Sequence, residues 1–171
     1  MEEIIVEQLG EIRVHELPED QWQRLRHLRL ASLSESPDAF GDNLETEEML
    51  SEEQWRKKFE KLNHLIAVID SIDIAVLSVE NLEGDFGATC WIGGCWVNPE
   101  YRGRGVMKAL ISYLDEHAEE RGWKVQGLGV FSDNDEAIAA YEKLGFIRKG
   151  ELQPSTRRCG RSFQRMIRDP R

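Results

Sequence analysis

Residues 102–108 combine residue types that bind an anion. The segment reads Arg-Gly-Arg-Gly-Val-Met-Lys and lies between an apolar run and a helical apolar stripe. The first amides of a helix have no partner inside the helix, and the helix dipole adds partial positive charge there. Two glycines let a ligand approach the backbone and three basic side chains add whole charges, so the segment predicts a cradle for a pyrophosphate. The residues of this cradle are Arg102, Gly103, Arg104, Gly105, Val106, Met107 and Lys108.

The glycine spacing of this cradle differs from that of two common nucleotide loops. The segment has no GxxxxGK spacing, so it is not a Walker A loop. The residue three positions beyond Gly105 is Lys108, so the GxGxxG pattern of dinucleotide folds is absent as well. A nucleotide-binding domain of another kind is therefore disfavoured. The plainer alternative is that Gly103 and Gly105 only turn the chain.

A second group of candidate residues lies about 30 positions further along the chain. Asn134 and Tyr141 are seven residues apart, close to two helical turns, so their side chains fit one helix face. If that face fronts the cradle, Asn134 can hydrogen-bond a ligand and Tyr141 can protonate a leaving group. Two simpler interpretations stay open here: Asn134 as a helix cap, and Tyr141 as a partly buried aromatic residue.

The elements that must position these residues follow from the apolar pattern. Short apolar or alternating runs predict strands, and apolar residues three and four apart predict helices. Ser51 and Gln54 form a capping box at one helix start, and Gly93-Gly94 marks a bulge or a close approach inside a strand. The result is a mixed α/β fold, expected as a single domain over residues 1–171. The predicted strands are 12–17, 64–69, 74–79, 89–97, 125–130, 146–151 and 162–167, and the predicted helices are 18–31, 51–62, 107–118 and 133–144.

Composition and charge limit the class of protein. The formal net charge is −10 and the mean hydropathy is −0.51, which disfavours a nucleic-acid backbone binder and a membrane protein. The charge is uneven, because residues 1–60 hold 7 basic and 16 acidic residues whereas residues 146–171 hold 8 basic and 2 acidic ones. Such a distribution either attracts ligands of opposite sign at two places or is ordinary surface ion pairing, and the second interpretation is favoured.

The chain start and the cysteines favour a cytoplasmic protein. Glu2 and Glu3 give the chain an acidic start, whereas a signal peptide needs a basic start followed by an apolar block. Cys90, Cys95 and Cys159 are an odd number without CxxC spacing, so a disulfide framework is not expected. The four histidines form no HExxH-like cluster, and no metal site is expected.

Together the two candidate segments resemble the GNAT superfamily of acetyl-CoA-dependent N-acetyltransferases. Residues 102–105 match the first four positions of the motif Arg/Gln-x-x-Gly-x-Gly/Ala. The likeness runs from Ile12 to Ile167 and implies a mixed, largely antiparallel central sheet flanked by helices, with strands that splay at the cofactor site. The later segment matches Asn-x-x-Ala-x-x-x-Tyr-x-x-x-Gly-Phe at Asn134, Ala137, Tyr141, Gly145 and Phe146.

The resemblance implies a role for each candidate residue. Backbone amides of residues 103–108 hold the CoA pyrophosphate, and Asn134 contacts the cofactor arm. Tyr141 gives a proton to the departing CoA thiolate after direct attack of a neutral amine on the acetyl thioester. Backbone groups of three strand residues pair with the pantetheine arm and polarise the acetyl carbonyl. These strand residues are Cys95, Trp96 and Val97.

Two features depart from the family pattern. Met107 stands where Gly or Ala is usual, so its side chain either crowds the cofactor or, as we favour, turns into the core. The strands 89–97 and 125–130 contain no carboxylate to act as the general base, so water or a carboxylate of the acidic front half must take the proton. Gly129 replaces the Glu of members specialised for protein amino termini, which disfavours that subclass.

The resemblance also limits the partners. In such folds the first helices and the loop between them, here Pro37–Glu48, cover the acceptor. Because this loop is acidic, the expected acceptor is a small cationic amine or a basic peptide. The competing hypothesis is a non-catalytic acyl-CoA-binding regulatory module, favoured by Met107 and the missing strand carboxylates and opposed by Tyr141. A homodimer is common among relatives.

Overall fold

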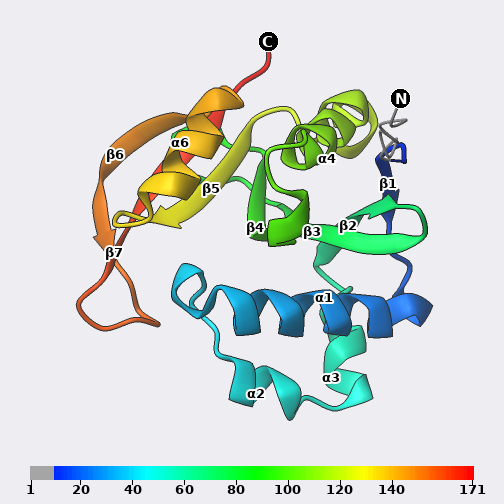
Figure 1. Cartoon of the computed structure of the whole chain (residues 1–171). Coiled ribbons are helices and arrows are strands. Elements are labelled where there is room, and N and C mark those ends of the chain that lie inside the picture. Colours follow the sequence, from blue (N-terminus) through cyan, green and yellow to red (C-terminus); the bar gives the residue numbers. More distant parts are fainter. Residues whose placement is uncertain (1–9) are drawn as a thin grey trace, which may run out of the picture.

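The computed structural model describes residues 10–171, which form one seven-stranded sheet with helices on both faces (Figure 1). The strand order is β1-β2-β3-β4-β5-β7-β6, and every neighbouring pair is antiparallel except β4–β5. This confirms the expected mixed, largely antiparallel α/β sheet. The acidic chain start at residues 1–3 lies outside the described residues.

The strands are β1 (Arg13–Glu16), β2 (Leu62–Ile69), β3 (Ile72–Asn81), β4 (Cys90–Val97), β5 (Gln126–Phe131), β6 (Ile147–Pro154) and β7 (Ser162–Arg168). The α-helices are α1 (Trp22–Glu35), α2 (Leu44–Glu48), α3 (Glu52–Lys57), α4 (Val106–Glu116), α5 (Ala118–Arg121) and α6 (Asp135–Lys143). Single 3₁₀ turns precede α1, α2, β4 and α4.

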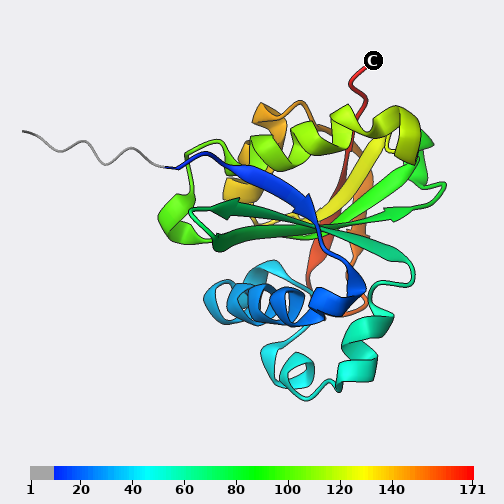
Figure 2. The same cartoon turned by 90° about the vertical axis from the view of Figure 1, so that its right-hand side faces the viewer.

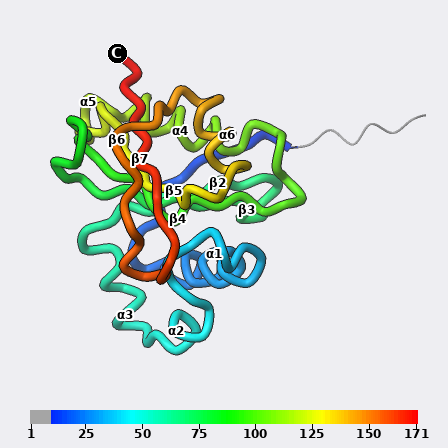
Figure 3. The backbone as a smooth tube through the Cα atoms, turned by 90° about the vertical axis from the view of Figure 1, so that its left-hand side faces the viewer, coloured from blue at the N-terminus to red at the C-terminus, as the bar shows by residue number. Residues whose placement is uncertain are grey.

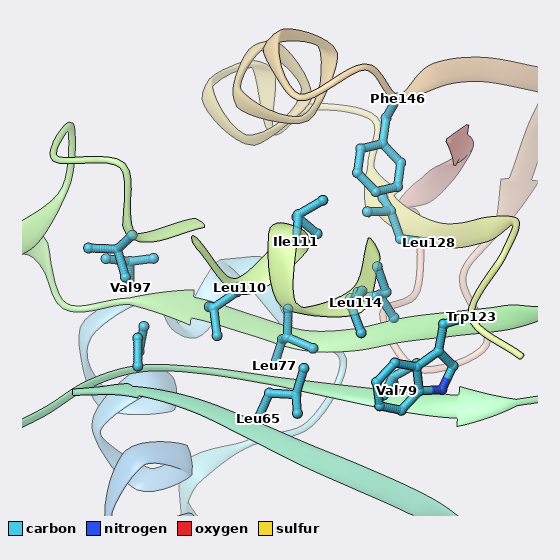
Figure 4. Close-up of a cluster of buried hydrophobic side chains, with 14 of the residues drawn as sticks. Leu65, Leu77, Val79, Val97, Leu110, Ile111, Leu114, Trp123, Leu128 and Phe146 are labelled. Carbon is cyan, nitrogen blue, oxygen red and sulfur yellow. The ribbon is translucent and has the colours of Figure 1, made fainter. Parts of the chain in front are cut away.

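The helices form two layers that separate the early part of the chain from the late part. Figure 2 shows α1–α3 below the sheet and α4–α6 above it. The upper core packs the apolar stripe of α4 on the strands, with Leu110, Ile111 and Leu114 buried among strand residues such as Leu77 (Figure 4). The lower core packs α1 and α3 on the opposite sheet face and encloses the completely buried Trp55. Every strand side chain near the site therefore faces one of these two layers.

Two predicted helix ends on the lower layer are wrong, and one helix was not predicted. The helix predicted to end at Ala31 continues to Glu35, because Leu33 still points into the lower core. The loop 37–48 contains the unpredicted helix α2, which begins where the Asn43 side chain accepts a hydrogen bond from the Thr46 amide. The next helix ends at Lys57 instead of residue 62, because β2 already begins at Leu62. The capping box of Ser51 and Gln54 at its start is confirmed.

The sheet opens between β4 and β5. These two strands pair only from Cys90 to Ile92, opposite Gln126 to Leu128, although both continue further. Just beyond this point β4 bulges against β3, as the glycine pair predicted, and Gly94 has a φ of 59°. The bulge bends β4 away from β5, so the two strands diverge in Figure 1. We call this opening the splay.

Candidate functional site

The splay exposes backbone in the middle of the sheet. Gly93 on β4 and Gly129 on β5 are both exposed, and no atom lies within 4 Å of the position that a Cβ of Gly93 would take. Since β4 and β5 no longer pair there, their amides and carbonyls toward each other are available to a ligand.

The loop from Val97 to α4 has the geometry of an anion cradle. Gly103 and Gly105 have φ values of 77° and 81°, a left-handed conformation that disfavours other residues. No atom lies within 4 Å of either Cβ position, so the backbone is open to an approaching group. Gly105 caps α4 without a side chain, and the first amides of that helix remain free. This open loop is compatible with the pyrophosphate that residues 103–108 are predicted to bind.

The three basic side chains of the cradle are not equivalent. Arg102 donates from Nε to the Val97 carbonyl at 3.0 Å and from Nη2 to Glu35 at 3.1 Å, so its charge serves the protein itself. The guanidinium of Arg104 lies over the Tyr101 ring, 5.6 Å from its centre. Arg104 and Lys108 are exposed and form no ion pair within the described part of the chain. That all three bind a phosphate stays a prediction, and Arg102 is the one whose guanidinium already has partners within the protein.

Tyr141 lies next to β4, near the splay. It projects from α6 onto the upper core, edge-on to Phe146, and its hydroxyl faces the Cys95 thiol on β4. The Cys95 Sγ in turn lies 3.2 Å from the Met107 Sδ. Met107 packs against the upper core, which confirms the favoured interpretation of its side chain.

Burial sets the protonation states of this group. It raises the pKa of Cys95 to about 12 and raises the pKa of Tyr141 well above its usual value of 10. Both side chains therefore stay protonated at neutral pH. A protonated phenol can donate a proton, whereas a protonated thiol is a poor nucleophile. The arrangement favours direct transfer over a covalent intermediate on Cys95.

Asn134 caps α6, as the simpler interpretation had it. Its Oδ1 accepts a hydrogen bond from the Ala137 amide at 3.2 Å, and its backbone begins the helix that carries Tyr141. The cap leaves the two amide hydrogens of Asn134 available, because no partner for them occurs within residues 10–171. Trp96 contributes its backbone to the splay while its indole is buried in the lower core.

Comparison with known proteins gives the same picture. The acetyltransferase (GNAT) family matches residues 21–146. An acetyltransferase of Sodalis glossinidius, SG1711, is 38% identical over 113 residues, which are 64% of this chain and 72% of that protein. The chain belongs to the GNAT acetyltransferase family. The resemblance inferred from the two motifs is thereby confirmed, and with it the expected acetyltransferase class.

Solved structures share this fold at low sequence identity. The acetyltransferase yncA of Salmonella typhimurium, solved with acetyl-CoA, has a TM-score of 0.70 at 16% identity and covers 92% of this chain and 93% of its own. RimL, a ribosomal L7/L12 α-N-protein acetyltransferase solved with coenzyme A, has a TM-score of 0.72 at 16% identity and covers 95% and 98%. At such identities the likeness shows the GNAT fold alone.

The α1 side of the splay is covered by two distant segments of this GNAT chain. Figure 3 shows the β6–β7 loop beside the turn that follows α1. Arg158 donates to the carbonyls of Pro37, Phe40 and Asp42 at 2.9 to 3.3 Å. Arg161 donates to the Asp38 carbonyl at 2.6 Å. We call these two segments, residues 37–43 and 155–161, the acceptor cover.

Ion pairs neutralise two of the five carboxylates of the acidic loop that the sequence indicated. Asp42 pairs with Arg29 and with Arg157. Glu47 is buried and lies between Arg29 at 3.6 Å and Lys58 at 3.4 Å. In the basic tail, all seven arginines of residues 146–171 donate to carboxylates or carbonyls of the protein. The plain interpretation of the uneven charge, ordinary ion pairing, is confirmed.

Sequence reasoning missed two residues beside the site. Arg29 of α1 brings its Nη1 to 3.3 Å from the Cβ position of Gly94 at the bulge. Glu35, the last residue of α1, accepts a hydrogen bond from the Trp96 indole at 3.0 Å. Both lie in the acidic front half, from which a carboxylate near the site was expected, but no local pattern distinguishes them from other charged residues on α1.

The described residues contain neither a membrane-spanning helix nor a metal-binding group. Among residues 10–171, none of the helices combines the length and the apolar composition that a bilayer span requires. In the same range no three His, Cys, Asp or Glu side chains are grouped to hold a metal ion.

Proposed function

We propose that this GNAT acetyltransferase moves an acetyl group from acetyl-CoA to a primary amine at the splay. One observation carries the proposal: three features occur together on the α4 side of the sheet. They are the open β4–β5 gap, the free amides at the start of α4 and the protonated Tyr141. Acetyl-CoA supplies an activated acyl thioester when bound. The amides of residues 103–108 would hold its pyrophosphate, and Asn134 would contact its arm.

The chain's own groups suffice for the bond changes. The amine nitrogen forms a bond to the acetyl carbon while the carbon–sulfur bond breaks, and Tyr141 gives its proton to the sulfur. Backbone amides of Cys95–Val97 would polarise the acetyl carbonyl, since they lie at the open edge of β4. The acceptor ammonium first loses one proton to become the neutral amine, and its nitrogen loses a second proton as the amide forms; water or a carboxylate of the acceptor side takes both. The Tyr141 phenolate is then reprotonated from solvent.

For the acceptor we propose only that it carries positive charge. A cationic small amine or basic peptide was expected from the acidic loop, but Asp42 and Glu47 of that loop are already paired within the protein. Glu45 and Glu48 on α2 are exposed and, like Asp38, have no ion pair within residues 10–171, so these carboxylates remain for a cation. The cytoplasmic location and the homodimer stay predictions.

The first experiment measures CoA thiol release from acetyl-CoA with polyamines, aminoglycosides, amino acids and basic peptides. A blank without acceptor corrects for the three native cysteines. Turnover with one amine class should fall by about 10²-fold or more in Tyr141→Phe, because the proton donor is lost. Calorimetry should show acetyl-CoA binding to be unchanged in this variant.

The same experiment separates the alternatives. Binding of acetyl-CoA without turnover on any amine would favour the non-catalytic acyl-CoA-binding module. Full turnover in Tyr141→Phe would remove Tyr141 from the mechanism. If Glu45→Gln with Glu48→Gln leaves the KM of a cationic acceptor unchanged, these carboxylates do not select the acceptor.

A further inference from the structure

A single carboxylate joins the cofactor loop to the acceptor side of the sheet. Glu35 ends α1, and its Oε2 accepts hydrogen bonds from the Trp96 indole at 3.0 Å, from Arg102 Nη2 at 3.1 Å and from the neighbouring Ser36 hydroxyl. Burial acts to raise the pKa of Glu35, but these hydrogen bonds outweigh it and lower the pKa. Glu35 is therefore an anion at neutral pH.

Arg102 is fixed at both ends of its guanidinium. Its Nε donates to the Val97 carbonyl, where β4 ends, and its Nη2 reaches Glu35 across 67 positions of the sequence. The contact places the start of the cradle at a set distance from the end of α1. The loop glycines that follow have nothing near their Cβ positions, so no packing of their own holds them.

The same carboxylate stands at the beginning of the acceptor cover. Pro37, two residues after Glu35, begins the turn whose carbonyls accept from Arg158. A displacement of Arg102 would therefore move Glu35, and with it the end of α1 and residues 37–43. A ligand that binds one segment then strengthens the binding of a ligand at the other. The coupling free energy is the same in both directions, because linkage is reciprocal.

We propose that Glu35 is a positioning residue that preforms the cofactor loop and couples it to the acceptor cover. The inference rests on the proposed function for the identity of the two ligands. It assigns Arg102 to the preformed loop and not to the phosphate, and it makes acceptor binding depend on cofactor binding through a side chain that touches neither ligand.

The chain contains a matched control for this carboxylate. Glu52 also accepts from a tryptophan indole, Trp22 at 3.1 Å, and from an arginine, Arg56 at 3.2 Å, but lies at the start of α3 away from the splay. Glu35→Gln and Glu52→Gln therefore remove the same charge from the same kind of triad.

The test compares amide hydrogen exchange of the ligand-free proteins. Glu35→Gln should speed exchange of residues 98–108 and 37–43 while the β2–β3 amides stay protected, and Glu52→Gln should leave both segments as in the wild type. Acetyl-CoA should bind about three- to tenfold more weakly to Glu35→Gln, the loss expected for a partly exposed, charge-assisted pair. In an Arg102→Gln background, Glu35→Gln should cause little further loss.

Two results would overturn the proposal. One is unchanged exchange of residues 98–108 together with unchanged acetyl-CoA binding in Glu35→Gln. The other is faster exchange throughout the protein, which would make Glu35 a general stabilising residue. Once an acceptor is known, KM values should rise while kcat stays within about twofold, since no reacting atom is touched. If the wild type fails to bind acetyl-CoA, the proposed function falls, while the exchange comparison still decides the role of Glu35.

Discussion

On the α4 side of the splay, one continuous segment from Val97 to Lys108 forms the candidate cofactor loop. On the α1 side, two segments more than 100 positions apart form the acceptor cover. The first is shaped by backbone conformation, with two left-handed glycines before a helix start. The second is held by arginine side chains that donate to carbonyls and carboxylates. The first side therefore depends mainly on backbone conformation, whereas the second depends on many particular side chains.

The largest loss of stability should come from the buried carboxylate under the acceptor cover. Glu47→Ala leaves Arg29 and Lys58 facing each other without their shared anion. We expect the free energy of unfolding to fall by about 3 kcal/mol, as for a broken buried pair. Denaturant unfolding measures this, with the exposed Glu45→Ala on the same helix as control. Equal stability of the two variants would show that the cover does not depend on this charge.

Two neighbouring arginines test how the cover is held. Arg158 donates to three carbonyls, whereas Arg157 is 65% exposed and forms an ion pair with Asp42. Arg158→Ala should lower the free energy of unfolding by about 2 kcal/mol, because charged donors are lost from backbone acceptors. Arg157→Ala should lower it by at most about 0.5 kcal/mol, the usual value for an exposed pair. If Arg157→Ala were the more destabilising variant, exposed ion pairs and not backbone hydrogen bonds would hold the cover.

A buried histidine makes the α1 side sensitive to acid. His64 hydrogen-bonds Ser78 Oγ and the Lys58 carbonyl, and burial lowers its pKa from 6.5 to about 4. The unfolded chain then binds the proton more readily between these two pH values, so stability is full above pH 6.5 and falls as the pH drops toward 4. The contribution at pH 5 should be about 2 kcal/mol below that at pH 7.5.

Urea unfolding at the two pH values measures this change. His64→Gln should flatten the pH dependence between pH 7.5 and 5, whatever its effect on stability at neutral pH. An equally steep dependence in that variant would assign the acid sensitivity to other groups.

Two left-handed glycines, one on each side of the splay, allow a comparison by matched substitutions with a small expected effect. Gly105 and Gly160 have φ values of 81° and 80°, and neither has an atom within 4 Å of its Cβ position. Alanine at either place should lower stability by about 1 kcal/mol, the cost of a left-handed residue with a Cβ. Only Gly105→Ala should also weaken acetyl-CoA binding in calorimetry. Equal weakening in Gly160→Ala would mean that the cover also shapes the cofactor loop.

Much of the cofactor side could be predicted from the sequence. The glycines of the cradle, the apolar stripe of α4 and the helix that carries Asn134 and Tyr141 depend on residues within about four positions of each other. Helix starts and turns respond to such short-range patterns. The contact of Arg102 with Glu35 could not be predicted, because the two residues lie 67 positions apart.

The α1 side contains features that short-range sequence patterns do not predict. Helix α2 was missed because its five residues carry no apolar stripe long enough to indicate a helix. The acidic loop suggested a free negative surface, since composition gives no information on which carboxylates meet the arginines of the tail. Those pairs form only when the chain brings residues 37–47 beside residues 155–161 and Arg29.

The sequence by itself determined the strand and helix types, the mixed sheet, the family and the loop that would hold a pyrophosphate. These depend on backbone preferences and on the burial of one face, which neighbouring residues decide. Only the tertiary structure decided that β4 and β5 part after three paired positions, that Arg102 pairs with Glu35, and that Asp42 and Glu47 of the acidic loop are already paired. Such contacts depend on the path of the whole chain, because charged side chains pair with whichever partner the fold brings within a few ångströms.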